Sequence, residues 1–186
     1  MRPVLCAEVL LNIPIGALVQ NIQKHIEIAC GPRQYGAGRS GGASLQIAEV
    51  RAAARLRPKM AIVTLDVKNA FGSVTWAHAL EACLRLVPDL APALAGQWIN
   101  NVAPIWVETV ANHWAKHDVY SSLLQGAQDG NPVFCLVLAM GLTRATDRFE
   151  GHALHHELQG LPARARMLRQ VQHWAFVDDV TIQAPV

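Results

Sequence analysis

Three aspartates occupy positions in the sequence at which they could together bind divalent metal ions. Asp66 ends a short apolar run over residues 61 to 65, whose β-branched side chains predict a strand buried on both faces. Asp178 and Asp179 separate two strand-like runs, 173 to 177 and 180 to 182, so the pair is expected at a hairpin turn. Adjacent strand residues point to opposite faces, and a turn beneath the pair would let both carboxylates serve one site.

Carboxylate oxygens suit Mg²⁺, which keeps several waters and is usually held by one or two carboxylates plus substrate phosphates. Two such ions, about 3.5–4 Å apart, can activate a hydroxyl and stabilise a leaving pyrophosphate during in-line displacement. The expected cofactor is therefore a pair of Mg²⁺ ions, with Mn²⁺ as the alternative, and the expected reaction is nucleotidyl transfer. Aspartates in a hairpin turn also have a structural explanation, because aspartate forms turns readily and keeps a sheet edge soluble.

The elements around these residues predict an α+β chain with a small antiparallel sheet packed on helices. Pro14 marks a kink or a boundary between two helices, and Asn131 is expected to cap a helix that carries Pro132 in its first turn. A glycine-rich loop is expected over residues 31 to 42. Helices are predicted over residues 5 to 29 in two parts, 43 to 56, 76 to 86, 92 to 102 and 131 to about 150, and a hairpin over 106 to 123.

The composition fits one ordinary core and no strongly basic surface. The chain has 186 residues, of which 52% are hydrophobic and 16% charged, and its net charge is +2, below that of a dedicated nucleic-acid binder. The cations are nonetheless grouped, and each group has two interpretations, a solvated face or a contact with phosphates. The groups are Arg51, Arg55, Arg57 and Lys59, and Arg164, Arg166 and Arg169.

Several other functions are disfavoured by the sequence. The four cysteines are widely spaced in apolar stretches, which indicates neither a disulfide framework nor a zinc site, and favours a reducing compartment. Residues 152 to 157 contain three histidines and a glutamate without a metal-binding order, so a solvated helix end is expected. The apolar run before Val19 is interrupted by Glu8, Asn12 and Pro14, so neither a signal peptide nor a membrane span is predicted.

The same residues, in order, resemble the reverse transcriptases of non-LTR (LINE-type) retrotransposons. Leu65-Asp66-Val67-Lys68-Asn69-Ala70-Phe71 is similar to motif A, Gln125 to Pro132 resembles motif B, and Phe176-Val177-Asp178-Asp179 resembles motif C. Earlier segments also resemble the family: Arg2-Pro3-Val4, Gln34-Tyr35-Gly36 and Gly41-Gly42. The resemblance covers nearly the whole chain, and an ordered set of motifs is more specific than any single one.

The resemblance implies a partial right-hand polymerase and assigns roles to individual residues. Asp66 and Asp178 become metal ligands and catalytic residues, with Asp179 as the second acid of motif C. Phe71 becomes a steric gate against a ribose 2′-hydroxyl, although core packing explains it equally. Residues of motif B complete the set that the resemblance assigns to nucleotide binding. Capping of the following helix would also explain the loop of motif B. Its members are Gln125, Gly126, Gln128 and Gly130.

The family's organisation implies a partial fingers segment over residues 1 to 60 and a palm over 61 to 186. Motif A spans 65 to 74, motif B 125 to 135 and motif C 176 to 179, and no thumb is expected because the chain stops seven residues after Asp179. The implied partners are an RNA template, a DNA primer and deoxynucleoside triphosphates, without a membrane and with a nuclear location. Asp129 stands where the family has glutamine, and an acid there should hinder phosphate binding; Phe134-Cys135 and Gly72 also depart from the pattern.

Two other functions fit parts of the sequence. Gly36 to Gly41 satisfies G-x-G-x-x-G and is followed by a predicted helix, a strand and Asp66, as in a dinucleotide-binding unit, but no strand is predicted directly before Gly36. The chain also fits a decayed, non-catalytic retrotransposon remnant that retains nucleic-acid binding. By resemblance we expect an RNA-directed DNA polymerase fragment whose activity alone is weak or absent.

Overall fold

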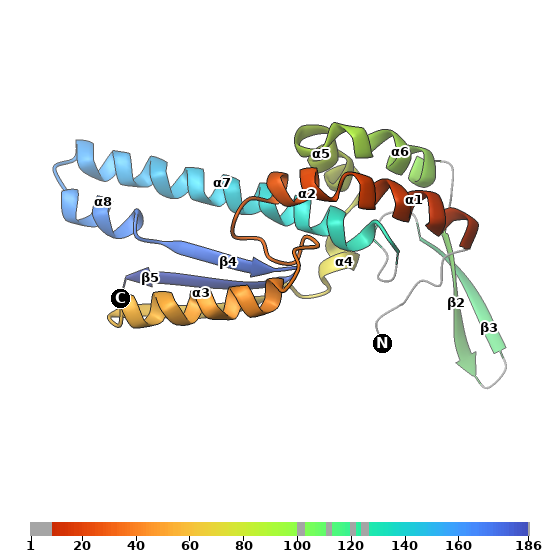
Figure 1. Ribbon diagram of the computed structural model, residues 1–186, viewed down its shortest axis with the longest axis horizontal. Helices are drawn as coiled ribbons and strands as arrows, with labels where there is room; N and C mark the ends of the chain where they lie inside the picture. The colour runs from red at the N-terminus through yellow and green to blue at the C-terminus, as the bar shows by residue number, and fades with distance from the viewer. Residues whose placement is uncertain (1–8, 100–102, 111–112, 120–121, 124–126, 186) are drawn as a thin grey trace. The chain divides into compact units, whose positions relative to one another are not determined.

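A computed structural model of the chain describes residues 9–99, 103–110, 113–119, 122–123 and 127–185 (Figure 1). Helices and two small antiparallel sheets alternate along the described chain, which confirms the predicted α+β class. The residues form two compact units: unit 1 comprises residues 1–26 and 68–137, and unit 2 comprises 27–67 and 138–186. Each unit therefore contains two separate stretches of sequence. The division into fingers and palm at residue 60 stays a prediction.

Unit 2 is built on a three-stranded antiparallel sheet with the order β1-β5-β4. Strands β4 (Gln172–Phe176) and β5 (Asp179–Pro185) form a hairpin, as the sequence predicts, but its turn is one residue earlier than predicted. Val177 and Asp178 are the two turn residues, and Asp179 is the first residue of β5. Strand β1 (Met60–Asp66) pairs with the other side of β5, from Met60 opposite Pro185 to Asp66 opposite Asp179. This register brings the end of β1 and the start of β5 to the same end of the sheet.

Two helices enclose the hairpin of unit 2 from opposite sides (Figure 1). Helix α3 (Gly42–Leu56) covers the face that carries Trp174, whose indole N–H donates to Glu49 of that helix at 3.3 Å. The other face carries His173 and Ile182, which line a cavity with α7 (Gly130–Leu158). Helix α8 (Pro162–Leu168) connects α7 to β4. The hairpin is thus the middle layer of unit 2, and its Trp174, Ala175 and Val180 are buried.

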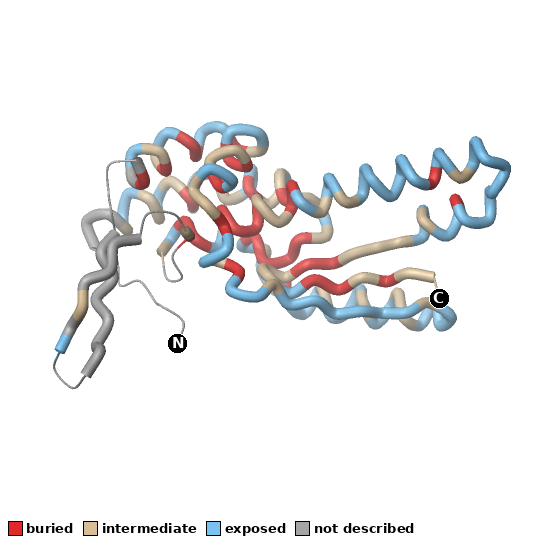
Figure 2. Tube along the Cα trace, turned by 180° about the vertical axis from the view of Figure 1, so that it is seen from behind, coloured by how far each residue is buried: buried red, intermediate tan, exposed pale blue. Residues whose placement is uncertain are grey.

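Strand β1 contradicts the prediction of a strand buried on both faces. All of its residues after Met60 are exposed, and Ile62, Val63 and Leu65 retain 40%, 50% and 48% of their accessible surface. Figure 2 shows the contrast between this exposed strand and the buried residues of the hairpin. The reason is topological: among the described strands β1 pairs only with β5 and lies at the edge of the sheet, and an apolar β-branched run does not distinguish an edge strand from a central one.

The described part of unit 1 is mainly helical. Thr75 caps α5, as its hydroxyl accepts from the His78 N–H, and the Trp76 and Trp98 rings stack with centroids 6.1 Å apart. Its elements are α1 (Val9–Asn21), the first four residues of α2 (Gln23–Cys30), α4 (Ala70–Ser73), α5 (Trp76–Leu86), the 3₁₀ turn η1 (Pro88–Leu90), α6 (Ala91–Ile99), β2 (Ala103–Val110), β3 (His113–Val119) and the start of α7. The antiparallel pairing of β2 with β3 confirms the predicted hairpin.

The first helix break and the start of α7 differ from the predicted positions. Pro14 lies inside α1, so it is not the boundary between the first two helices, and that boundary falls at Ile22. A kink at Pro14 stays a prediction. Helix α7 begins at Gly130, which places Asn131 inside the helix and Asp129 immediately before it, and it extends to Leu158.

None of the described helices is long and apolar enough to cross a lipid bilayer.

Candidate carboxylate site

The register of unit 2 brings the three predicted catalytic aspartates together at one end of its sheet. Asp66 is the last residue of β1 and pairs directly with Asp179, the first residue of β5. Asp178, the second residue of the hairpin turn, directly precedes Asp179. Asp66 and Asp179 are exposed and Asp178 is half-buried, so solvent reaches all three side chains.

Two like charges occupy directly opposite positions at this end of the sheet. Like charges on directly opposite strand residues destabilise a sheet, and Asp66 and Asp179 occupy such a pair. Within the described part of the chain, none of the three aspartates forms an ion pair. A bound divalent cation would offset the repulsion between them.

The donor chemistry of the three aspartates suits Mg²⁺ or Mn²⁺, since every side-chain donor is a hard carboxylate oxygen. Across the described ranges, no three His, Cys, Asp or Glu side chains converge so as to hold a metal ion by themselves. Magnesium sites of phosphoryl-transfer enzymes are commonly completed by water and substrate phosphates. A pair of neighbouring carboxylates with an adjacent third is a donor set of that open kind.

The residues predicted to bind the nucleotide belong to unit 1, and two of them, Gln125 and Gly126, lie outside the described residues. Phe71 is half-buried, and its ring packs on Phe134 with centroids 5.2 Å apart. Gln128 is exposed and Gly130 is the buried first residue of α7. The packing explanation for Phe71 is therefore present in the structure, and its proposed role as a gate stays a prediction.

Asp129 is buried, with 2% of its surface exposed. Burial raises the pKa of its carboxyl above the ordinary value. Burial also raises the pKa of the Cys83 thiol to about 12, and the negative charge of Asp129 adds to that rise, which places this carboxyl near α5. The Asp129 side chain therefore lies in the interior of unit 1. The sequence had suggested an acid that faces the phosphates of a substrate.

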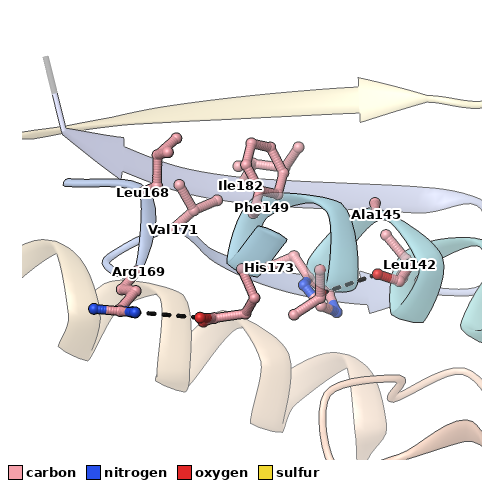
Figure 3. Close-up of a pocket in the computed structure, with 10 residues that line it drawn as sticks. Leu142, Ala145, Phe149, Leu168, Arg169, Val171, His173 and Ile182 are labelled. Carbon is pink, nitrogen blue, oxygen red and sulfur yellow. Dashed lines mark hydrogen bonds and ion pairs between the residues drawn. The ribbon is translucent and has the colours of Figure 1, made fainter. Parts of the chain in front are cut away.

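One cavity of unit 2 lies between α7 and the hairpin, on the face opposite α3 (Figure 3). Its volume is about 80 Å³, and its wall is mostly apolar, with Leu142, Phe149 and Ile182 among its residues. Ligand pockets usually measure about 300–1,000 Å³, so this cavity is too small for a nucleotide. His173 lines it, and burial followed by the charge of Arg33 lowers the pKa of this imidazole.

The two basic groups lie on unit 2 and are exposed. Arg169 is neutralised by Glu157 and by Glu150, the latter at 3.4 Å. The remaining six cations form no ion pair within the described residues: Arg51, Arg55, Arg57, Lys59, Arg164 and Arg166. Arg57 and Lys59 lie beside Gln170 in one surface depression, so the connection before β1 adjoins the connection before β4. At the end of α7, His152 and His155 are exposed, as a solvated helix end predicts, whereas His156 is half-buried and its Nδ1 has no hydrogen-bond partner among the described residues.

The loop from Gly36 to Gly41 lacks the setting of a dinucleotide-binding unit. It follows α2 and one isolated bridge residue, Gln34, where such a unit requires a strand. The strand that follows α3 pairs antiparallel to β5, whereas that fold uses parallel strands. The loop has a different role in unit 2, because it contacts the turn that carries Asp178.

The amino-acid sequence did not predict the contact between this loop and the turn. Gln34 is buried and its side chain bonds to Val177, which is 143 residues away in the sequence. No local pattern indicates a partner at that separation. The only available signal was a polar residue in a segment that resembles the family.

Comparison with known proteins leaves the family of the chain unassigned. No protein-family model, no curated protein and no solved structure matches it. The motifs and the geometry of unit 2 are therefore the basis for inferring a function.

Proposed function

We propose that the chain is part of a nucleotidyl transferase of the reverse-transcriptase type, with unit 2 supplying the catalytic carboxylates of its palm. One observation carries the proposal: Asp66 and Asp179 are paired across neighbouring strands, and Asp178 lies in the adjoining turn. The partners would be an RNA template, a DNA primer and deoxynucleoside triphosphates. The resemblance to retrotransposon enzymes adds the expectation of a nuclear location.

In the proposed reaction the primer 3′-hydroxyl gives its proton to water and its oxygen bonds to the α-phosphorus of the incoming nucleotide. The bond from that phosphorus to the bridging oxygen breaks, and pyrophosphate leaves. Two divalent ions, when bound, would lower the pKa of the 3′-hydroxyl and stabilise the charge on the leaving group. Asp66 and Asp178 would hold and orient these ions, and Asp179 would add negative charge beside them. The exposure of this end of the sheet gives a large substrate access to the carboxylates.

Primer extension on an RNA template with Mg²⁺ or Mn²⁺ tests the proposal. Asp178→Asn should lower the rate by on the order of 100-fold or more, because a lost metal ligand removes several kcal/mol of transition-state stabilisation. Asp147→Asn is the matched control, since Asp147 is an exposed aspartate on α7, and it should leave the rate unchanged. Extension that is absent in every protein, or equal in all three, would reject catalysis by this chain.

The unpaired cations of unit 2 favour a second candidate, nucleic-acid binding without catalysis. Arg57 and Lys59 together could neutralise two phosphates, and each neutralised phosphate adds about 0.9 to the slope of log affinity against log salt for duplex DNA. Arg57→Gln combined with Lys59→Gln should reduce this slope by about 2. Arg148→Gln, which removes an exposed charge from α7, is the control for a single charge. Unchanged slopes would identify the cations as a solvated face.

A further inference from the structure

The turn that carries Asp178 has a strained backbone. Val177 and Asp178 connect β4 to β5, and Val177 has a φ of +54°. A positive φ at the first of two turn residues is usually supplied by glycine, because a β-branched side chain is disfavoured there. Such strain persists only where the surroundings hold it, and it concentrates at functional sites.

The side-chain amide of Gln34 forms hydrogen bonds with both backbone polar groups of Val177, its N–H and its carbonyl. The Val177 N–H donates to Gln34 Oε1 at 3.2 Å, and Gln34 Nε2 donates to the Val177 carbonyl at 3.4 Å. The same Oε1 accepts from the Gly36 N–H at 2.9 Å, which fixes the amide in place. Gln34 is only 2% exposed, so water does not compete freely for these bonds.

The backbone around Gln34 is itself attached to β4. The Ala175 N–H donates to the Arg33 carbonyl and the Tyr35 N–H donates to the Ala175 carbonyl, both at 2.8 Å. Gly36 then contacts the turn so closely that a Cβ atom on it would lie 2.3 Å from the Val177 nitrogen. Residues 33 to 36 therefore form a clamp along β4 that ends on the strained turn.

We propose that Gln34 is the positioning residue of the carboxylate site. By holding Val177 in the left-handed conformation, its amide fixes the backbone from which Asp178 and Asp179 project. The catalytic consequence rests on the proposed function, whereas the hold on Val177 does not. Polar residues that orient metal ligands without touching the metal typically change metal affinity by 10- to 100-fold when removed.

The experiment combines Gln34→Ala with Val177→Gly and measures Mn²⁺ binding by the electron paramagnetic resonance signal of free Mn²⁺. Gln34→Ala should raise the Mn²⁺ midpoint by about tenfold. In the Val177→Gly background the same substitution should change the midpoint by less than about twofold, because glycine adopts a positive φ without being held. Gln170→Ala, at an exposed glutamine of unit 2, is the control and should leave the midpoint unchanged.

Rescue by Val177→Gly separates positioning from a general loss of structure. An equal loss of Mn²⁺ affinity in both backgrounds, or no loss in either, would overturn the proposal. If Gln34→Ala does not fold, Gln34→Asn replaces it, since its amide is one methylene too short to reach Val177, and the same two outcomes decide.

If Asp178→Asn leaves Mn²⁺ binding unchanged, the proposed function fails, and a separate measurement is then needed for Gln34. Hydrogen exchange of the Val177 amide then decides on the clamp alone. Exchange should accelerate at least about tenfold in Gln34→Ala, because the amide loses its acceptor. Unchanged exchange would overturn the clamp as well.

Discussion

The two supports of the carboxylate site differ in how they are held. Asp66 ends β1, which pairs with one strand in the described part of the chain and has exposed apolar side chains on both faces. Asp178 and Asp179 belong to a hairpin that is covered by α3 and α7 and fixed at its turn by Gln34. The pair of Asp66 and Asp179 therefore links a weakly packed edge strand to a firmly packed hairpin. We expect the stability of the site to depend mainly on the hairpin.

The largest effect is expected where the clamp meets the turn. Gly36→Ala places a Cβ atom 2.3 Å from the Val177 nitrogen, a backbone atom that cannot move without shifting the hairpin. We expect a loss of about 3 kcal/mol in the free energy of unfolding, at the upper end of overpacking effects. Urea denaturation measures it. Gly141→Ala is the matched control, since an added Cβ meets nothing within 4 Å in α7, and should stabilise the protein by about 1 kcal/mol.

A pair of valines compares the two supports directly. Val180 in β5 is 5% exposed and Val63 in β1 is 50% exposed. Truncation to alanine should cost about 2 kcal/mol at Val180, because a buried side chain leaves a cavity, and less than about 0.5 kcal/mol at Val63. Equal losses in urea denaturation would contradict the difference between hairpin and edge.

The sequence could predict the elements of unit 2 but not how they meet. The strand before Asp66 and the hairpin at Asp178 follow from local apolar runs and a turn, and both exist in the structure. The pairing of Asp66 with Asp179 does not follow, because periodicity carries no information about which strands are neighbours. The same limit caused the error over the burial of β1.

Long-range polar contacts were also beyond sequence reasoning. The bond of Gln34 to Val177 spans 143 residues and involves a side chain without an unusual local pattern. Val177 itself gave a misleading signal, because a β-branched residue before two aspartates predicts strand and not a left-handed turn residue. Functional positions are often places where local preference and the fold disagree.

A smaller effect is expected from pH, and it concerns the hairpin only. His173 of β4 has a lowered pKa, from burial and then from Arg33, so the folded protein disfavours its protonated form. Its contribution to stability is complete above the unfolded pKa of about 6.5 and is lost as the pH falls from there through the lowered folded pKa. His173→Gln should make the urea midpoint depend less on pH between pH 7 and pH 5. An unchanged slope would exclude His173 as the cause of any acid destabilisation.

The smallest effect should appear where the two supports meet. Asp66→Asn removes one charge from the pair with Asp179 and should stabilise the metal-free protein by about 0.2–1 kcal/mol at low salt. Asp179→Asn should do the same, and the double variant should add little, because either change alone removes the repulsion. The gain should fall in 1 M NaCl, where the Debye length is about 3 Å. Mn²⁺ should reverse the order and stabilise the wild-type protein more than Asp66→Asn, since only the wild type retains both carboxylates. A gain that persists in Mn²⁺ would mean that Asp66 and Asp179 do not share a cation, and the edge and the hairpin would then have no common function at this end of the sheet.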